Sequence, residues 1–236
     1  HRHYRRQRQM CIRDSVKSVL KLSFVLMDTS PPSQFLVTLD VEGVLTPEIW
    51  IAVANHFGID ALKRTTKDEP DYQLLMKERI RLINEHNITL VDIQSVISSL
   101  SPLDGALAFL NELRSVVSVV LLSDTFEEFI RPLMLQLENP LVLCHRLFVD
   151  EGGHISSFVE RTPNQKFEAV RAFQKLNYQV IAAGDSYNDL AMIDEADAGF
   201  LFRAPDHVRT ERSDLVYFNE YADLLSSIKE IVENGC

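Results

Sequence analysis

Cysteine is scarce in this chain of 236 residues. The three cysteines, Cys11, Cys144 and Cys236, are an odd number and lack the short spacing of a metal site. A disulfide framework is therefore not indicated, and this usage is typical of a reducing compartment. We predict a cytoplasmic protein.

Positive charge is also in short supply, because 24 lysines and arginines face 34 acidic residues. The net charge of −10 and the pI near 5.2 argue against nucleic acid as the main partner, since binding to a phosphate backbone needs clustered cations. A local cationic pocket is compatible with this balance.

A run that is apolar enough for a membrane span is not apparent. The moderately apolar residues 16–26 contain two lysines and are too short to cross a bilayer. We predict no membrane partner.

The first seventeen residues differ in charge from the rest. They carry five arginines and Lys17 against Asp14 alone, a net charge of +5, whereas the remaining 18 cations and 33 anions give −15. The string QRQMCIRDS resembles translated sequencing-adapter read-through, so we expect residues 1–30 to be a non-native or disordered extension, with a natural start at Met27. The competing interpretations are a basic arm and a targeting segment over residues 16–26.

The hydrophobic content of 46% is enough for one enzyme-sized unit with a substantial core. No repeat or low-complexity stretch interrupts it. From position 31 onward, strand-like and helix-like patterns alternate, which is typical of an α/β fold with a doubly wound, Rossmann-like parallel sheet. The predicted strands are residues 35–41, 116–122, 179–183, 199–202 and 215–218, and two further runs in 141–159 indicate a β-hairpin.

The pattern between the first two strands is helical. Apolar residues recur there at the spacing of one helix face, most clearly over residues 72–85. We expect residues 47–100 to form a small helical cap inserted after the first strand. Residues 31–46 and 101–236 would form the Rossmann-like core.

Four short segments place residues suited to phosphate chemistry after apolar, strand-like runs. In an open parallel sheet the ligand crevice lies outside the carboxyl ends of the strands, so these segments can converge although they are far apart in sequence. They are residues 35–46, residues 116–125, the region of Lys166, and residues 180–189. Carboxylates, a hydroxyl and a lysine would meet there.

Asp40 stands at the end of the first predicted strand. Its carboxylate can attack phosphorus and form an aspartyl phosphate, which divides phosphoester cleavage into two in-line transfers. Glu42 returns to the same side if the chain stays extended, and its carboxyl could protonate the departing alkoxide and later deprotonate an attacking oxygen. The competing interpretations are a helix N-cap or turn residue for Asp40 and an exposed turn residue for Glu42.

A carboxylate nucleophile must approach a phosphate dianion, so like charge has to be cancelled. Mg²⁺ with oxygen ligands suits that task, and Asp185 would supply a second carboxylate beside Asp40. Asp189 is better placed to orient metal-bound waters or Lys166. Asp185 and Asp189 could instead cap the following helix.

The chain resembles the haloacid-dehalogenase-like phosphohydrolases, with all four motifs of that superfamily in order from residue 35 to the end. DVEGVLTPEIW at 40–50, SDTFEEF at 123–129 and AAGDSYND at 182–189 resemble the phosphoserine phosphatase branch. The likeness extends to the bifunctional phosphoserine phosphatase and phosphoserine:homoserine phosphotransferase family. It implies a Mg²⁺-dependent enzyme that takes phosphate from L-phosphoserine and passes it to water or homoserine through an aspartyl phosphate.

The resemblance also implies a role for each motif residue. It makes Asp40 the nucleophile and Glu42 the general acid/base, where most of the superfamily has aspartate. The implied metal ligands are Asp40, the main-chain carbonyl of Glu42, and Asp185. The implied phosphate and substrate contacts are Ser123, Asp124, Lys166 and Asn188.

Two of these contacts have physical reasons of their own. Ser123 follows an apolar strand and can donate its hydroxyl to a phosphoryl oxygen, together with backbone amides at a helix start. Lys166 adds a positive charge, although Lys175 lies nearby and a solvated helix lysine is the competing interpretation.

Substrate choice should depend on the cap. Arg79 interrupts an apolar helical stripe, and we favour a carboxylate clamp over a surface arginine. The resemblance implies a nearby glutamate for the substrate ammonium, which Glu48 matches only approximately, since a first-turn helix acid is an alternative. Phe126 could shield the site or pack in the core.

Other classes of protein fit only part of this pattern. A receiver-type signalling domain also phosphorylates an aspartate at a strand end, but the helical insert and the GDSYND segment do not suit it. A catalytically silent scaffold would not need this whole set of polar residues. Among enzymes, the alternative is a phosphatase for another small phosphomonoester, distinguished by whether Arg79 governs substrate affinity.

Overall fold

The computed structural model of the chain describes residues 34–65, 68–69 and 71–234. The predictions for residues 1–30, Met27, Cys11 and Cys236 concern residues outside this part. Cys144 lies within it and is a buried free thiol.

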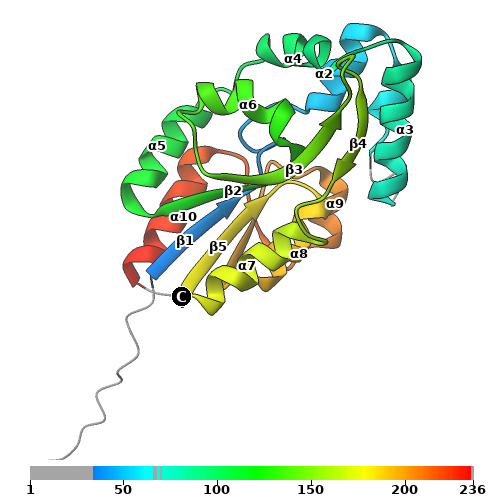
Figure 1. Cartoon of the computed structure of the whole chain (residues 1–236). Coiled ribbons are helices and arrows are strands. Elements are labelled where there is room, and N and C mark those ends of the chain that lie inside the picture. The colour runs from blue at the N-terminus through cyan, green and yellow to red at the C-terminus, as the bar shows by residue number, and fades with distance from the viewer. Residues whose placement is uncertain (1–33, 66–67, 70, 235–236) are drawn as a thin grey trace, which may run out of the picture. The chain divides into compact units, whose positions relative to one another are not determined.

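A seven-stranded sheet organises the described residues, with the strand order β4-β3-β2-β1-β5-β6-β7 (Figure 1). All neighbours are parallel except β3 and β4, which form an antiparallel hairpin. The strands are β1 (Gln34–Leu39), β2 (Ser118–Phe126), β3 (Val142–Val149), β4 (Ile155–Val159), β5 (Tyr178–Gly184), β6 (Ala198–Phe202) and β7 (Val216–Phe218).

Helices connect the strands and cover both faces of the sheet. They are α2 (Ile49–Phe57), α3 (Tyr72–Glu85), α4 (Leu90–Ser98), α5 (Ala106–Val116), α6 (Glu127–Gln136), α7 (Gln165–Lys175), α8 (Leu190–Glu195), α9 (Asp206–Glu211) and α10 (Tyr221–Asn234), with short 3₁₀ turns η1 (Asp60–Lys63) and η2 (Tyr187–Asp189). In this part of the chain, none of the helices combines the length and apolar character that a bilayer crossing requires.

The central strand β1 supplies side chains to a core on each face, because successive side chains of a strand point to opposite sides. Leu36 belongs to one buried cluster, with Val170 of α7. Val37 belongs to the other, with Phe109 of α5. Figure 1 shows α5 and α10 on one side of the sheet and α7 and α8 on the other. The predicted doubly wound parallel sheet is confirmed.

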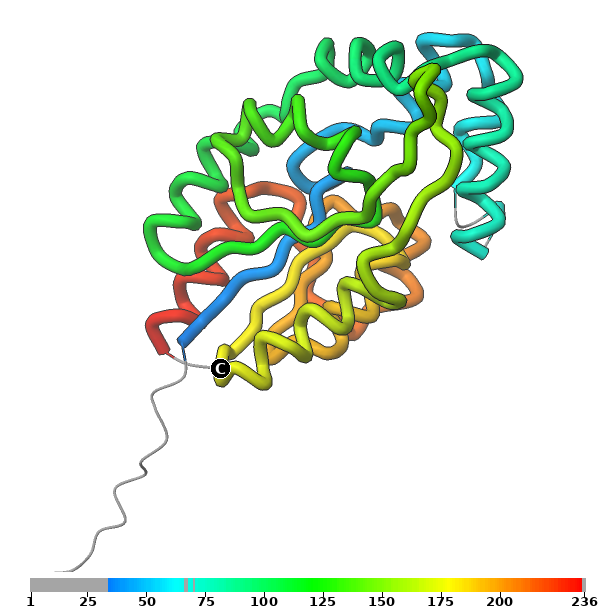
Figure 2. The backbone as a smooth tube through the Cα atoms, in the orientation of Figure 1, coloured from blue at the N-terminus to red at the C-terminus, as the bar shows by residue number. Residues whose placement is uncertain are grey.

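Helices α2, α3 and α4 lie beyond the carboxyl end of β1, where the cap was expected (Figure 1). The β3–β4 hairpin runs beside them, as the backbone trace in Figure 2 shows. The Asn84 side-chain amide donates to the Ile155 carbonyl at 2.9 Å, and the Leu90 amide donates to the Gly153 carbonyl at 2.9 Å. The division into a cap and a core stays a prediction.

The predicted strands lie where the structure has them, but their ends differ: β1 ends at Leu39 instead of residue 41, and α5 extends to Val116, so β2 begins at Ser118 instead of residue 116. β2 continues to Phe126 instead of ending at Leu122, because the Ser123 carbonyl accepts a hydrogen bond from the Gln165 side chain and Phe126 pairs with His145 of β3 across an irregular register. α9 and η1 were missed because such short helices cannot show a helical period.

Phe126 is fully buried. Its ring packs against Phe129, His145 and Phe158. Of the two interpretations of Phe126, the core aromatic is therefore the one that the structure supports.

Candidate active site

Asp40 follows the last residue of β1 and is tied to the neighbouring strand. Its amide donates to the Ala183 carbonyl of β5 at 3.0 Å, and its exposed fraction is only 6%. Burial raises the pKa of Asp40, as do the carboxylates of Asp189 and Asp185, against the opposing effect of Lys166. The site therefore disfavours a bare negative charge here unless cations compensate it.

Lys166, in the first turn of α7, supplies one such cation. Its Nζ atom lies 2.7 Å from Asp189 Oδ1, 2.8 Å from Asp40 Oδ1 and 3.3 Å from Asp124 Oδ2. Burial lowers the pKa of Lys166, but these three carboxylates outweigh it and the pKa rises well above its usual value. Lys166 therefore stays protonated, whereas Lys175 is exposed at the far end of the same helix.

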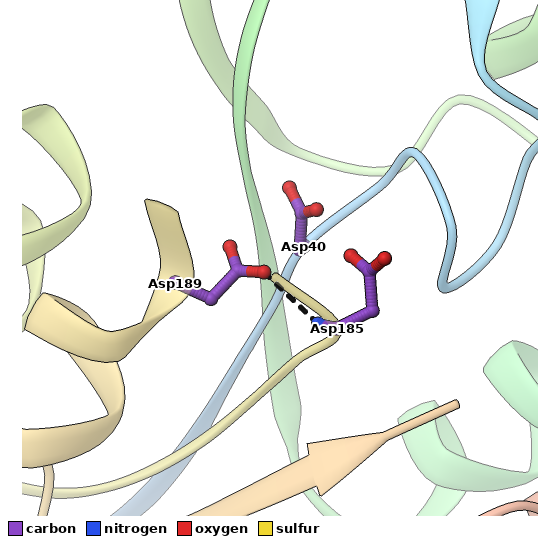
Figure 3. Close-up of side chains that lie close together, drawn as sticks. All are labelled: Asp40, Asp185 and Asp189. Carbon is purple, nitrogen blue, oxygen red and sulfur yellow. Dashed lines mark hydrogen bonds between the residues drawn. The ribbon is translucent and has the colours of Figure 1, made fainter. Parts of the chain in front are cut away.

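Asp189 is fully buried, and hydrogen bonds occupy both of its carboxylate oxygens. Oδ1 accepts from Lys166. Oδ2 accepts from the amides of Asp185 and Ser186, each at 2.9 Å, and from the Ser186 hydroxyl at 3.0 Å. This residue organises the loop that follows β5 (Figure 3).

Asp185 extends from that loop beside Asp40, and Asp189 completes the group in Figure 3. One ligand oxygen from each of these three carboxylates lies within 4.8 Å of the other two. Burial, together with the carboxylates of Asp189 and Glu48, raises the pKa of Asp185 to about 8.

The donor set fits a hard, oxygen-liganded cation. Three close carboxylates and the carboxylate of Asp124 face the single ammonium of Lys166, so the site holds more negative charge than its own cation balances. Asp40 and Asp185 are the residues suited to hold the ion, because both carboxylate oxygens of Asp189 already accept hydrogen bonds from protein donors.

Glu42 lies at the start of the segment that leads into α2. Its Oε1 atom accepts a hydrogen bond from the Ile49 amide at 2.7 Å, which fixes the carboxyl against the helix start. Burial raises the pKa of Glu42 to about 7, with a further contribution from the Glu48 carboxylate and an opposing one from the Ile49 amide. A carboxyl with that pKa can both donate and accept a proton near neutral pH.

A first cavity of about 250 Å³ connects this carboxyl with the helices beyond the sheet. It brings Glu42 and Asp185 together with Arg79 of α3 and with Glu48, and Trp50 and Asn188 also line it. The predicted site residues at the strand ends and those of the helices beyond the sheet therefore line the same cavity. Burial raises the pKa of Glu48, while the Arg79 guanidinium acts in the opposite direction.

Arg79 is buried, with an exposed fraction of 8%. Its pKa is lowered to about 10 by burial, so the guanidinium stays charged at neutral pH. Among the described residues, no carboxylate oxygen lies within 4.0 Å of it, and its Nε atom has no hydrogen-bond partner. The arginine is thus a charged, buried donor rather than a surface side chain.

A second cavity of about 310 Å³ adjoins the first and is lined by Lys166 together with Asp124, Asn188 and Tyr72, of which the last three line both cavities. Asp40 and Ser123 are not among the residues lining either one. Ser123 is 1% exposed, and its hydroxyl oxygen accepts from the Thr125 amide at 3.3 Å. It lies inside β2 and not at a helix start.

The sequence comparison decides the family. A sequence model of the haloacid dehalogenase-like hydrolases matches residues 36–197. The chain belongs to this hydrolase family. The resemblance inferred from the motifs is thereby confirmed.

Individual relatives of this haloacid dehalogenase-like hydrolase carry a narrower name. A phosphoserine phosphatase from Pseudomonas syringae pv. tomato is 54% identical over 176 residues, which cover 75% of this chain and 74% of that protein. Phosphoserine phosphatase ThrH from Pseudomonas aeruginosa is 51% identical over 189 residues, which cover 80% of this chain and 92% of that protein.

Solved structures show the same fold. A phospho-aspartyl intermediate analogue of phosphoserine phosphatase superimposes with a TM-score of 0.69 at 18% identity, covering 83% of this chain and 99% of that one. A substrate-bound phosphoserine phosphatase complex gives a TM-score of 0.66 at 17% identity, covering 86% and 99%. At these identities the likeness concerns the fold alone.

Several residues that line the cavities of this haloacid dehalogenase-like hydrolase were not singled out from the sequence as site residues. Among them are Trp50, Tyr72, His145 and Gln165. Tyr72 was assigned to an apolar stripe, yet its hydroxyl donates to the Asp124 carbonyl at 2.6 Å. Gln165 donates to the Ser123 and Leu143 carbonyls. Only the position of Gln165 beside Lys166 offered a signal, because the other contacts join elements distant in sequence.

Proposed function

We propose that this haloacid dehalogenase-like hydrolase is a Mg²⁺-dependent phosphoserine phosphatase, with homoserine as a second phosphate acceptor besides water. The observation that carries the proposal is the shared cavity of Glu42, Asp185 and Arg79. It combines phosphate chemistry with a buried guanidinium suited to a substrate carboxylate. The 51–54% identity to two phosphoserine phosphatases supports the same substrate.

In the first transfer, an Asp40 carboxylate oxygen attacks phosphorus as the bond from phosphorus to the serine oxygen breaks. Lys166 fixes Oδ1 at 2.8 Å, which leaves Oδ2 to attack. Glu42 gives its proton to the departing serine oxygen. The products are serine and an aspartyl phosphate on Asp40.

In the second transfer, Glu42 takes a proton from the attacking hydroxyl of water or homoserine. The new bond to phosphorus forms as the bond to Asp40 breaks, which restores the aspartate. Both transfers use the same carboxyl, because Glu42 alternates between acid and base and its pKa of about 7 suits both roles.

Mg²⁺ bound by Asp40, the Glu42 main-chain carbonyl and Asp185 would supply charge neutralisation for the phosphate oxygens. Ser123, Lys166 and the backbone amides that follow Ser123 would donate to those oxygens. Asp189 would keep Lys166 and the loop after β5 in place through its four hydrogen bonds.

Substrate recognition would rest on the helices that follow β1. Arg79 would bind the substrate carboxylate, and Glu48 its ammonium, since both line the first cavity. Asp124 and Asn188 would complete the contacts to phosphate or substrate. Residues 47–100 would act as a cap over a core of residues 31–46 and 101–236, excluding bulk water during the first transfer.

A cytoplasmic location and the lack of a nucleic-acid partner stay predictions that rest on cysteine usage and charge. A phosphatase for another small phosphomonoester is the alternative function. Weak dependence of substrate affinity on Arg79 would favour it.

The test measures release of phosphate and formation of phosphohomoserine from L-phosphoserine with Mg²⁺, with and without homoserine. Loss of both activities in Asp40→Asn is expected. Release without transfer would leave a simple phosphatase, whereas absence of turnover by the wild type would overturn the substrate assignment.

A further inference from the structure

The single tryptophan of the chain lies against the arginine of the first cavity. Trp50 is the second residue of α2 and has an exposed fraction of 7%. The guanidinium carbon of Arg79 lies 4.8 Å from the centroid of its ring. This is within the range of a cation–π contact, which is strongest over tryptophan.

Few other contacts hold the Arg79 guanidinium. One terminal nitrogen donates to the Arg64 carbonyl at 2.6 Å, and the other lies 3.7 Å from the Met76 sulfur, a weak acceptor. The Nε atom has no hydrogen-bond partner among the described residues. One good hydrogen bond permits rotation about its own axis, so the flat face of Trp50 is the contact that fixes the plane of the guanidinium.

Other aromatic residues pack against Trp50 and hold its ring in place. Its ring makes an edge contact with Phe129 of α6 at 5.4 Å, and Phe129 in turn meets Phe126 at the end of β2 at 5.5 Å. Both phenylalanines are fully buried. A rigid aromatic row therefore connects Arg79 with the strand that carries Ser123 and Asp124.

We propose that Trp50 is a positioning residue that orients Arg79 for the substrate carboxylate and thereby sets selectivity for phosphoesters that carry one. This inference rests on the proposed function, in which Arg79 binds that carboxylate. The phosphorus chemistry at Asp40 and Glu42 would not depend on Trp50.

The test compares two substrates in Trp50→Leu and Trp50→Phe. L-phosphoserine carries the carboxylate, and O-phosphoethanolamine has the same phosphate and ammonium without it. In Trp50→Leu we expect KM for L-phosphoserine to rise about two- to thirtyfold, the factor that corresponds to ~0.5–2 kcal/mol for a cation–π contact. The kcat for both substrates and the KM for O-phosphoethanolamine should stay within about twofold of the wild type.

Trp50→Phe keeps an aromatic face, so its KM for L-phosphoserine should be much closer to the wild-type value than that of Trp50→Leu. Phe109→Leu is the matched control, because Phe109 is a buried aromatic of α5 that stacks on Tyr221 and lines neither cavity. Phe109→Leu should lower the melting temperature without changing the KM for L-phosphoserine relative to the KM for O-phosphoethanolamine. If Trp50→Leu does not fold, Trp50→Met, which also lacks an aromatic face, takes its place, and a KM for L-phosphoserine equal to the wild type in that variant would contradict the proposal.

A spectroscopic readout accompanies the kinetics. In Asp40→Asn, which should bind without turnover, L-phosphoserine should change the fluorescence of Trp50 and O-phosphoethanolamine should change it less. Equal KM effects on both substrates in Trp50→Leu, or none, would overturn the role of Trp50 while leaving the phosphatase intact. A wild type with equal KM values for both substrates would instead overturn carboxylate recognition by Arg79, and the role of Trp50 with it.

Discussion

A Cβ atom on Gly43 would lie 2.5 Å from Oδ2 of Asp185, closer than real Cβ atoms approach an oxygen. Gly43 also has a φ of +80°, a conformation that side-chain-bearing residues rarely adopt. A side chain at this position would therefore push the Asp185 carboxylate away from the turn after Asp40.

Gly43→Ala should consequently displace the Asp185 carboxylate. We expect the half-saturating Mg²⁺ concentration for phosphate release to rise at least tenfold, and the free energy of unfolding to fall by roughly 1–2 kcal/mol for the left-handed backbone alone. Gly58→Ala is the control, because Gly58 has a φ of +69° and no atom within 4 Å of the added Cβ. Equal Mg²⁺ dependence in the two variants would contradict the close approach of Gly43 to Asp185.

Lys166→Met should remove the only cation within hydrogen-bonding reach of both Asp40 and Asp189 in the described part of the chain. Without Mg²⁺, the free energy of unfolding should fall by about 3–5 kcal/mol, because two buried carboxylates lose their partner. We expect kcat to fall at least a hundredfold, and added Mg²⁺ to raise the melting temperature more than in the wild type. Lys175→Met, on the exposed end of α7, should leave the free energy of unfolding, kcat and the effect of Mg²⁺ on the melting temperature unchanged.

Asp189→Asn tests how the loop after β5 is held. An asparagine keeps one oxygen acceptor, so it cannot accept both from Lys166 and from the Asp185 and Ser186 donors. We expect a tenfold or larger loss of Mg²⁺ affinity by calorimetry, although Asp189 would not bind the metal itself. Asp194→Asn, which alters an exposed pair with Arg212, is the comparison and should leave the affinity unchanged. Unaltered metal binding in Asp189→Asn would argue against this role.

Most of the fold was accessible from the sequence because its strands are apolar runs separated by helical patterns. The strand ends also identified Asp40 and Asp185, since parallel strands bring their carboxyl ends to one edge. The structure indeed places these two carboxylates beside each other, although their catalytic roles stay predictions. Lys166 was chosen over Lys175 from the sequence, and the structure adds the reason, because Lys166 is buried among three carboxylates whereas Lys175 is exposed.

Contacts between elements that are distant in sequence could not be predicted from the sequence, for a physical reason. Nothing in the pattern of α2 shows that Trp50 faces Arg79 of α3, since that contact depends on how two helices pack. The polar residues after Leu122 were expected to end the strand, but the side chain of Gln165 donates to the Ser123 carbonyl and the strand continues. Periodicity reports local structure, and tertiary hydrogen bonds can override it.

Tyr72→Phe tests whether the first turn of α3 is anchored to β2. The Tyr72 hydroxyl donates to the Asp124 carbonyl at 2.6 Å, and the ring makes edge contacts with His145 and Phe158. Removing the hydroxyl keeps those ring contacts and leaves a partly buried carbonyl without its donor, so unfolding by denaturant should become easier by about 1–2 kcal/mol.

Tyr72→Phe should also weaken the attachment of α3 to β2, which places Arg79 of α3 in the first cavity. We therefore expect KM for L-phosphoserine to rise a few-fold with kcat reduced less, because Tyr72 lines both cavities but takes no proton in the proposed chemistry. Tyr178→Phe is the matched control, since the Tyr178 hydroxyl makes no hydrogen bond within the described residues and its ring packs against Phe173 and lines neither cavity. If both variants unfold at the same denaturant concentration and share the wild-type KM, the hydrogen bond to Asp124 does not position α3, and the contact of Asn84 with the β3–β4 hairpin must hold the helix instead.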